Sequence, residues 1–175
     1  RRIHQFFLVN YLVIFRHFFS IPIYLVMAYK TKFYPENVSK YIGDPVKIIC
    51  RSLWERKVCK WMDSNKNILR WGSEEIAIPY VSPKDNRVHK YYPDFIAEHK
   101  NDKGTIETLV IEVKPDKQTK PPKPRKKTRS FLGECLTYEI NKSKWEAAKK
   151  ACKEKNWRFV ILTEKQIFPE KNNGT

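Results

Sequence analysis

Apolar and polar residues follow regular spacings in the first half of the chain after residue 50. Residues 52–64 carry apolar side chains at helical spacing. Residues 75–81 and 108–114 alternate as strands do, and the aromatic run 90–98 lies between them. The pattern therefore predicts one helix followed by three strands, joined as an antiparallel meander.

The second half has a different pattern. Residues 115–129 are rich in Pro and Lys, which disfavours a regular helix or a central strand. We expect a short helical segment at 134–139, a second helix from Ser143 to about Lys155, with Ser143 and Glu146 at capping-box spacing, and an apolar strand at 157–163. The order helix, three antiparallel strands, helix, strand predicts an α/β fold with no internal repeat.

The N-terminal part of the chain, before residue 50, is less regular. Residues 30–48 contain Pro35, Gly43 and Pro45 and predict an irregular arm. Residues 1–26 are apolar and contain three Arg and no acid, and they permit three interpretations: a membrane helix, a signal peptide, or a segment outside the working protein. We favour the third, because a polar stretch begins at Met27. The functional domain is then expected at 27–175, and membrane anchoring is not expected.

Composition narrows the class of partner. The 175 residues include 35 Lys plus Arg against 19 Asp plus Glu, a net charge of +16, and 41% are hydrophobic. A chain with that much apolar surface folds, and so large a positive charge favours a polyanion such as nucleic acid as its partner. The four cysteines show no CxxC spacing, which argues against zinc. We expect them to be buried thiols in a reducing cytosol.

Two acids have a spacing that suggests shared chemistry. Asp94 and Glu112 each lie nine residues from Lys103. If the strands on either side pair about a turn at Lys103, the two carboxylates face each other at the distance that lets them share a divalent ion. Lys114 then lies on the same face as Glu112, and Val113 points into the core.

Such a site suits phosphodiester hydrolysis. Mg²⁺ held by two carboxylates keeps water ligands, binds a phosphate oxygen and lowers the pKa of a bound water, and Mn²⁺ could replace it. Lys114 could orient that water or offset charge on the phosphate. The alternative stays open at this point: Asp94 as a turn residue after Pro93, with Glu112 and Lys114 as solvated strand positions.

Longer stretches carry a family resemblance. The order of elements, with Pro93-Asp94 and Glu112-Val113-Lys114 on adjacent strands, resembles the PD-(D/E)xK nuclease superfamily, whose core is restriction-endonuclease-like. Between residues 34 and 167 the chain is similar to the head completion nucleases of T-even-type phages. The stretches concerned are YIGDP at 41–45, RSLWERK at 51–57, SEEIAIPYVSPKDNRVHKYYPDF at 73–95, IEVKPDKQTKPP at 111–122 and KWEAAKKACKEKNWRF at 144–159.

The resemblance implies a metal-dependent DNA endonuclease that acts on phage heads after DNA packaging. Asp94, Glu112 and Val113 would bind the metal, and Lys114 would be the catalytic lysine. Glu55 matches an acid that many members of the superfamily add to the site, although Ser52 and Glu55 also have capping-box spacing, so helix chemistry alone could explain this residue. Portal or neck proteins are the partners implied, in the virion and the host cytoplasm.

The loop at 115–129 is the expected DNA contact. Basic side chains here would bind phosphates without reading sequence. The candidates are Lys117, Lys120, Lys123, Arg125, Lys126, Lys127 and Arg129, with Gln118 as a further contact to a phosphate or water. A solvated tract, or a contact to an acidic protein, is the alternative. His89 is expected to be an ordinary strand or loop residue.

Two other functions remain open from the sequence. One is a non-enzymatic protein that binds DNA ends and plugs the head, with a vestigial site. The other is a transposon-end or repair nuclease of the same superfamily. The complete set of Asp94, Glu112 and Lys114 favours an enzyme.

Overall fold

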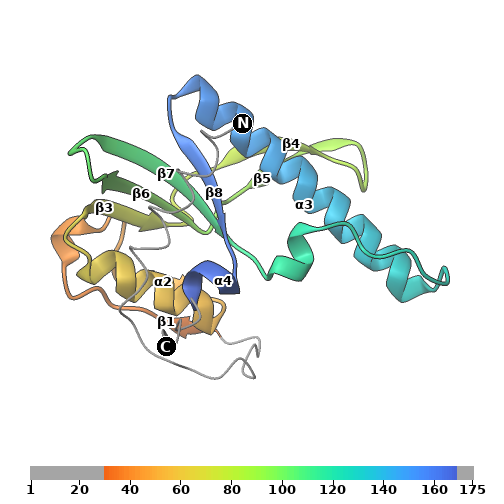
Figure 1. The fold of residues 1–175 in the computed structure, drawn as a ribbon, viewed down its shortest axis with the longest axis horizontal. Helices are drawn as coiled ribbons and strands as arrows, with labels where there is room; N and C mark the ends of the chain where they lie inside the picture. The colour runs from red at the N-terminus through yellow and green to blue at the C-terminus, as the bar shows by residue number, and fades with distance from the viewer. Residues whose placement is uncertain (1–29, 169–175) are drawn as a thin grey trace, which may run out of the picture.

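A mixed four-stranded sheet forms the centre of the protein in a computed structural model, which describes residues 30–168. The sheet order is β3 (Ile68–Ser73), β6 (Phe95–Lys100), β7 (Ile106–Val113) and β8 (Arg158–Leu162). The first three strands are antiparallel neighbours, and β8 joins β7 in parallel. Helix α3 connects these two parallel strands across the sheet (Figure 1).

Each face of the sheet has its own apolar cluster. On one face, Leu109, Ile111 and Val113 pack with residues of α2 (Leu53–Ser64) and α4 (Glu164–Ile167). On the other face, Val110 packs with Ala148 and Cys152 of α3 (Arg129–Glu154). Strand β7 therefore divides the core by simple alternation, as its sequence predicts.

A separate hairpin lies beside α3. It consists of β4 (Ile78–Ser82) and β5 (Arg87–Tyr91), paired only with each other in the described chain. Ile78 and Tyr91 join the cluster on the α3 face. The hairpin is thus attached at its base, while its valine pair Val81 and Val88 is exposed.

The segment before α2 is largely irregular, as predicted, but it is packed. It contains a short ladder between β1 (Thr31–Lys32) and β2 (Ile49–Cys50) and the 3-10 turn η1 (Val38–Lys40). Phe33 and Ile48 are buried in the α2 face of the core. The arm therefore closes the edge of the core near the start of α2.

Several predictions are confirmed. The α/β class with a mixed sheet is present, α2 begins after Ser52, and β8 occupies the predicted apolar stretch. The four cysteines are free thiols; Cys135 is only partly buried, and the others are buried.

In the described part of the chain, no helix is long and apolar enough to cross a membrane. Residues 1–26, assigned to a leader, lie outside the described residues.

The predicted three-strand meander is wrong in one respect. The run 90–98 is divided between β5 and β6, because Pro93 has no N–H for a ladder and the chain leaves β5 there. The neighbour of β6 on the side away from β7 is β3, a strand that the sequence pattern does not predict, whereas the predicted strand at 75–81 becomes β4 of the separate hairpin. Its letters, ILRWGS, do not alternate cleanly, and a bulge between Ile68 and Arg70 breaks the period.

The two helices predicted at 134–139 and 143–155 are one helix. Helix α3 is 26 residues long and begins at Arg129, directly after its N-cap Thr128, whose hydroxyl accepts the N–H of Phe131 at 3.2 Å. Ser143 lies in its interior and caps nothing. The stretch 129–154 contains no proline, and its single glycine, Gly133, does not stop propagation. The Ser143 and Glu146 spacing is therefore misleading.

A tight contact joins the arm to the end of β3. Gly43 has φ +99°, which L side chains rarely adopt, and a Cβ there would overlap the carboxylate of Glu75. That carboxylate accepts the hydroxyl of Tyr41 at 3.0 Å, and the same hydroxyl accepts the N–H of Ser73 at 3.3 Å. Within the YIGDP stretch, Gly43 therefore leaves room for the carboxylate of Glu75, which accepts the hydrogen bond from Tyr41.

We expect Gly43→Ala to lower the free energy of unfolding by at least about 1 to 2 kcal/mol, because it adds left-handed strain and displaces Glu75. The matched control is Gly133→Ala. A Cβ at Gly133 meets no atom within 4 Å, so this change should stabilise α3 by about 1 kcal/mol. Urea unfolding of the two variants measures both. Equal effects of the same sign would contradict the account.

Candidate active site

The two predicted acids lie opposite each other at one end of the sheet. Phe95 pairs with Ile111 and Ile96 with Val110. The next step in the same register places Asp94 opposite Glu112, as their equal spacing from Lys103 predicts. Asp94 Oδ2 accepts the backbone N–H of Val113 at 2.6 Å, which ties the first carboxylate to the strand that carries the second.

Glu112 is a buried acid with both carboxylate oxygens engaged. Its residue is 4% exposed. Tyr91 donates its hydroxyl to Oε2 at 2.6 Å, and Lys114 Nζ lies 3.0 Å from Oε1. Burial raises the pKa of Tyr91, and the charge of Glu112 raises it further, so this hydroxyl keeps its proton and acts as a donor. The carboxylate is therefore held in one orientation from two sides.

Asp94 is electrostatically strained. Burial, as the largest cause, and the charges of Glu112 and Glu55 together raise its pKa to about 8. The N–H of Val113 and the charge of Lys114 oppose this shift. A carboxylate in such surroundings is stabilised by a cation, so the site favours positive charge beside Asp94.

Lys114 supplies one such charge. Burial lowers its pKa, but Glu112 and Asp94 outweigh burial and raise the pKa above its usual value. The lysine is therefore a cation that lies among three acids. Its place on the same face as Glu112 follows from the period of two along the strand.

Glu55 is engaged at the start of α2. Its N–H is accepted by Ser52 Oγ at 3.1 Å, and its carboxylate accepts the Ser52 hydroxyl at 2.9 Å and the Arg51 N–H at 2.6 Å. This is helix-start chemistry, which the sequence suggested. The charge of Glu55 nevertheless acts on both Asp94 and Lys114. The structure thus brings all four candidate site residues into one neighbourhood.

Two neighbours of the acids are not predicted from the sequence. Tyr91 stands in an aromatic run beside Tyr92, and no letter distinguishes the buried tyrosine from the exposed one. Strand period identifies it only once β5 is known to end there. Arg51 precedes the cap residue of α2, and the charges of Glu55 and Asp94 act on its guanidinium.

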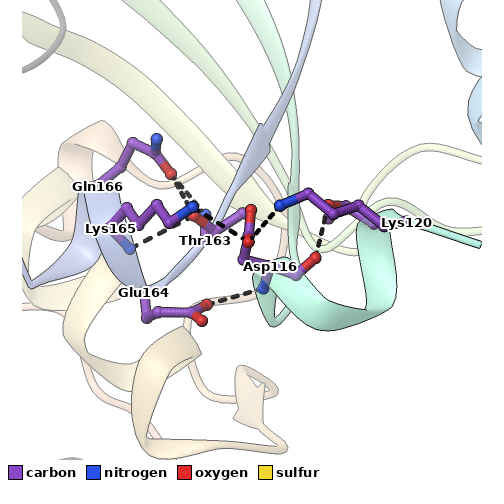
Figure 2. A network of polar contacts seen from close by, with 7 residues as sticks. Asp116, Lys120, Thr163, Glu164, Lys165 and Gln166 are labelled. Carbon is purple, nitrogen blue, oxygen red and sulfur yellow. Dashed lines mark hydrogen bonds and ion pairs between the residues drawn. The ribbon is translucent and has the colours of Figure 1, made fainter. Parts of the chain in front are cut away.

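The segment after Lys114 is fastened to α4. Asp116 opens the 3-10 turn η2 (Asp116–Thr119), and its N–H is accepted by Glu164 at 2.8 Å. Its carboxylate accepts Lys120 at 2.7 Å and Lys165 at 3.1 Å, as Figure 2 shows. Two lysines lower the pKa of Asp116. The first turn of the basic loop therefore has a fixed start beside the site.

The rest of the basic loop is exposed and extended. Of the residues predicted to contact DNA, Lys120, Lys123, Arg125, Lys126 and Lys127 lie in this extended part, Lys117 and Gln118 lie in η2, and Arg129 is the first residue of α3; all of them are exposed. Arg125 pairs with Glu134 at 2.7 Å and lies over the ring of Phe131, which attaches the loop to α3. His89 lies in β5 and bonds Asp85 at 2.9 Å, which is the ordinary strand role expected of it.

The donor set is small. Within residues 30–168, no three His, Cys, Asp or Glu side chains are grouped as a ready metal cluster. Asp94 and Glu112 supply carboxylate oxygens, and the backbone carbonyl of Val113 is the further ligand that the sequence resemblance implies. Hard cations such as Mg²⁺ accept such a set, because they complete their coordination with water.

Comparison with known proteins gives two matches. Residues 65–164 match the family model described as TnsA-like endonuclease N terminal. The chain is also 40% identical over 143 residues to the head completion nuclease of Enterobacteria phage T4, which covers 79% of this chain and 93% of that protein. The chain belongs to the head completion nuclease family, with a TnsA-like endonuclease domain. The matched range of the domain contains Asp94, Glu112 and Lys114 and excludes Glu55.

We expect Asp94→Asn to stabilise the metal-free protein. The raised pKa means that the fold holds the Asp94 proton more tightly than the unfolded chain does, so the wild type loses stability as pH rises from about 4 to about 8. Asn is neutral at every pH, and its carbonyl still accepts the Val113 N–H. Thermal unfolding in EDTA should show a gain of roughly 1 to 2 kcal/mol at pH 9 and a smaller one at pH 5.

Asp85→Asn is the control for this prediction. Asp85 is an acid of the exposed hairpin turn, so its replacement should stay within about 0.5 kcal/mol of wild type. A loss of stability in Asp94→Asn at pH 9 would show that the carboxylate is not repelled in its site.

Proposed function

We propose that this protein is a metal-dependent endonuclease that hydrolyses DNA phosphodiester bonds during phage head completion. The observation that carries the proposal is that Asp94 lies opposite Glu112 and that Lys114 Nζ lies 3.0 Å from the Glu112 carboxylate. The basic loop begins directly after Lys114. Family membership supports the nuclease activity and the phage setting. We place the functional domain at 27–175 and its action in the virion and the host cytoplasm.

Asp94, Glu112 and the carbonyl of Val113 are the proposed metal ligands. They fit Mg²⁺, with Mn²⁺ as a substitute, because all three are oxygens and because Asp94 lies where positive charge lowers its free energy. The ion, when bound, would activate a water and neutralise charge on the phosphate. Tyr91 and the Val113 N–H would hold the two carboxylates in the geometry that the ion needs.

Lys114 is the proposed catalytic lysine. Its ammonium is held by Glu112 and is partly buried, so it can offset charge that grows on the phosphate or orient the attacking water. Glu55 is proposed as an accessory acid. Its bonds to Ser52 and Arg51 fix its carboxylate near the site, and its charge adds to the field that attracts a metal.

The basic loop is the proposed DNA clamp. Lys117, Lys123 and Lys126 have no acid partner among the described residues, and they are exposed. Such cations bind phosphates of any sequence, so cleavage should show little base preference. Portal or neck proteins are the proposed protein partners, by family resemblance alone.

The first test is cleavage of linear, circular and branched DNA by the whole protein in Mg²⁺, in Mn²⁺ and in EDTA. Asp94→Ala and Glu112→Ala should each abolish cleavage in Mg²⁺ and leave DNA binding intact, because they remove metal ligands and not the loop. The control is Glu107→Ala, an acid on the same strand at the far end. Cleavage by either ligand variant would refute the metal site, and DNA binding without any cleavage by the wild type would favour a plugging protein.

The second test separates binding from chemistry. Neutralising Lys117, Lys123, Lys126 and Lys127 should weaken binding to every duplex alike and reduce the salt slope by about 0.9 for each phosphate that is no longer neutralised. The single-turnover rate at saturating DNA should change less. Lys114→Ala should show the reverse, with near-normal affinity and no turnover. A loop variant with normal affinity and salt slope would assign the loop to another partner.

A further inference from the structure

Arg51 lies at the rim of the acidic site. Its backbone N–H bonds the carboxylate of Glu55 at 2.6 Å. Its side chain is 55% exposed, and its guanidinium forms an ion pair with Glu74. The pKa of Arg51 is raised by the hydrogen bond to Glu74, and the charges of Glu55 and Asp94 act in the same direction. The guanidinium is therefore a second cation of the site, separate from Lys114.

Glu74, the ion-pair partner of Arg51, lies next to Asp94 at the end of β3. It has φ +56°, a left-handed conformation that non-glycine residues rarely adopt. Its backbone N–H donates to the carbonyl of Asp94 at 3.1 Å, one step beyond the pair of Ser73 and Phe95 that ends the β3–β6 ladder. Glu74 is thus joined to Asp94 through the backbone and to Arg51 through the side chain. The ion pair spans the junction between β3, α2 and the start of β6.

An exposed ion pair of this kind contributes little to stability, so fold energetics do not explain its position. Lys114 is partly buried and bound to Glu112, whereas Arg51 can exchange its partner without leaving a buried charge. A guanidinium matches phosphate geometry with two parallel hydrogen bonds. Substrate phosphate is the anion that must approach this rim.

We propose that Arg51 is a phosphate-binding residue of the site and that Glu74 holds its guanidinium in readiness until DNA replaces the carboxylate. The proposal rests on the proposed function, which supplies DNA as the anion. It adds a DNA contact from the residue before the N-cap of α2, whereas the basic loop contributes its contacts from the segment after β7. DNA would then be held from two sides of Asp94.

The test compares the two partners of the ion pair. Arg51→Gln should weaken binding to a short linear duplex in EDTA by about three- to tenfold and lower the salt slope by about 0.9. Glu74→Gln should strengthen binding, because it releases Arg51. In Arg51→Gln/Glu74→Gln the gain should vanish, since it depends on the arginine. Arg51→Lys should recover part of the affinity.

Arg70 and Glu98 provide a matched control pair. They form an ion pair at 3.8 Å with side-chain exposures of 57% and 34%, close to the 55% and 35% of Arg51 and Glu74. Arg70→Gln and Glu98→Gln should leave affinity and salt slope near wild type. Thermal unfolding of all variants checks that the fold is retained.

Two results would overturn the proposal. One is equal affinity in Arg51→Gln and wild type. The other is a Glu74→Gln gain that persists in the double variant, which would reflect only the removal of a negative charge. Cleavage in Mg²⁺ is read separately: a wild type that binds DNA with the expected Arg51 dependence but never cleaves would refute the proposed function and leave Arg51 as a phosphate contact.

Discussion

Two acids forced together by strand pairing dominate this structure. The register of β6 and β7 places Asp94, just before β6, opposite Glu112 of β7. Glu112 is almost wholly buried. Buried like charges are costly, so the surroundings must compensate. Three groups do so: the Tyr91 hydroxyl from β5, the Val113 N–H at the end of β7, and the Lys114 ammonium directly after that strand.

Much of the remaining architecture supports this arrangement. Helix α3 and the β4–β5 hairpin bury the ring of Tyr91 in one apolar cluster, so that its hydroxyl is aimed at Glu112. Arg51 and Ser52, just before α2, hold the carboxylate of Glu55, whose charge acts on Asp94. Asp116 and α4 fix the chain just after Lys114 (Figure 2). These groups do not fully offset the negative charge of the two acids, because the pKa of Asp94 is still raised. A divalent cation would supply the positive charge that is missing.

The sequence reveals the parts of this site that depend on local period. The separation of Asp94 and Glu112 sets their register once a turn at Lys103 is assumed, and Lys114 follows by alternation. It does not reveal contacts that depend on packing between distant elements. Tyr91 resembles Tyr92 until the break at Pro93 is placed, β3 hides its period behind a bulge, and Arg51 meets Glu74 across 23 residues. The pattern predicts α3 as two helices because an S-x-x-E spacing also occurs inside a helix.

The central claim is that the opposed carboxylates form a divalent metal site. Diffraction from crystals of the protein soaked in Mn²⁺, with anomalous data, tests it most directly. We predict one strong anomalous peak at about 2.1 Å from oxygens of Asp94, Glu112 and the Val113 carbonyl, with waters completing the shell. A peak elsewhere would contradict the account. So would the absence of any ion beside Asp94 at saturating Mn²⁺, with the Glu112 carboxylate still bonded to Tyr91 and Lys114.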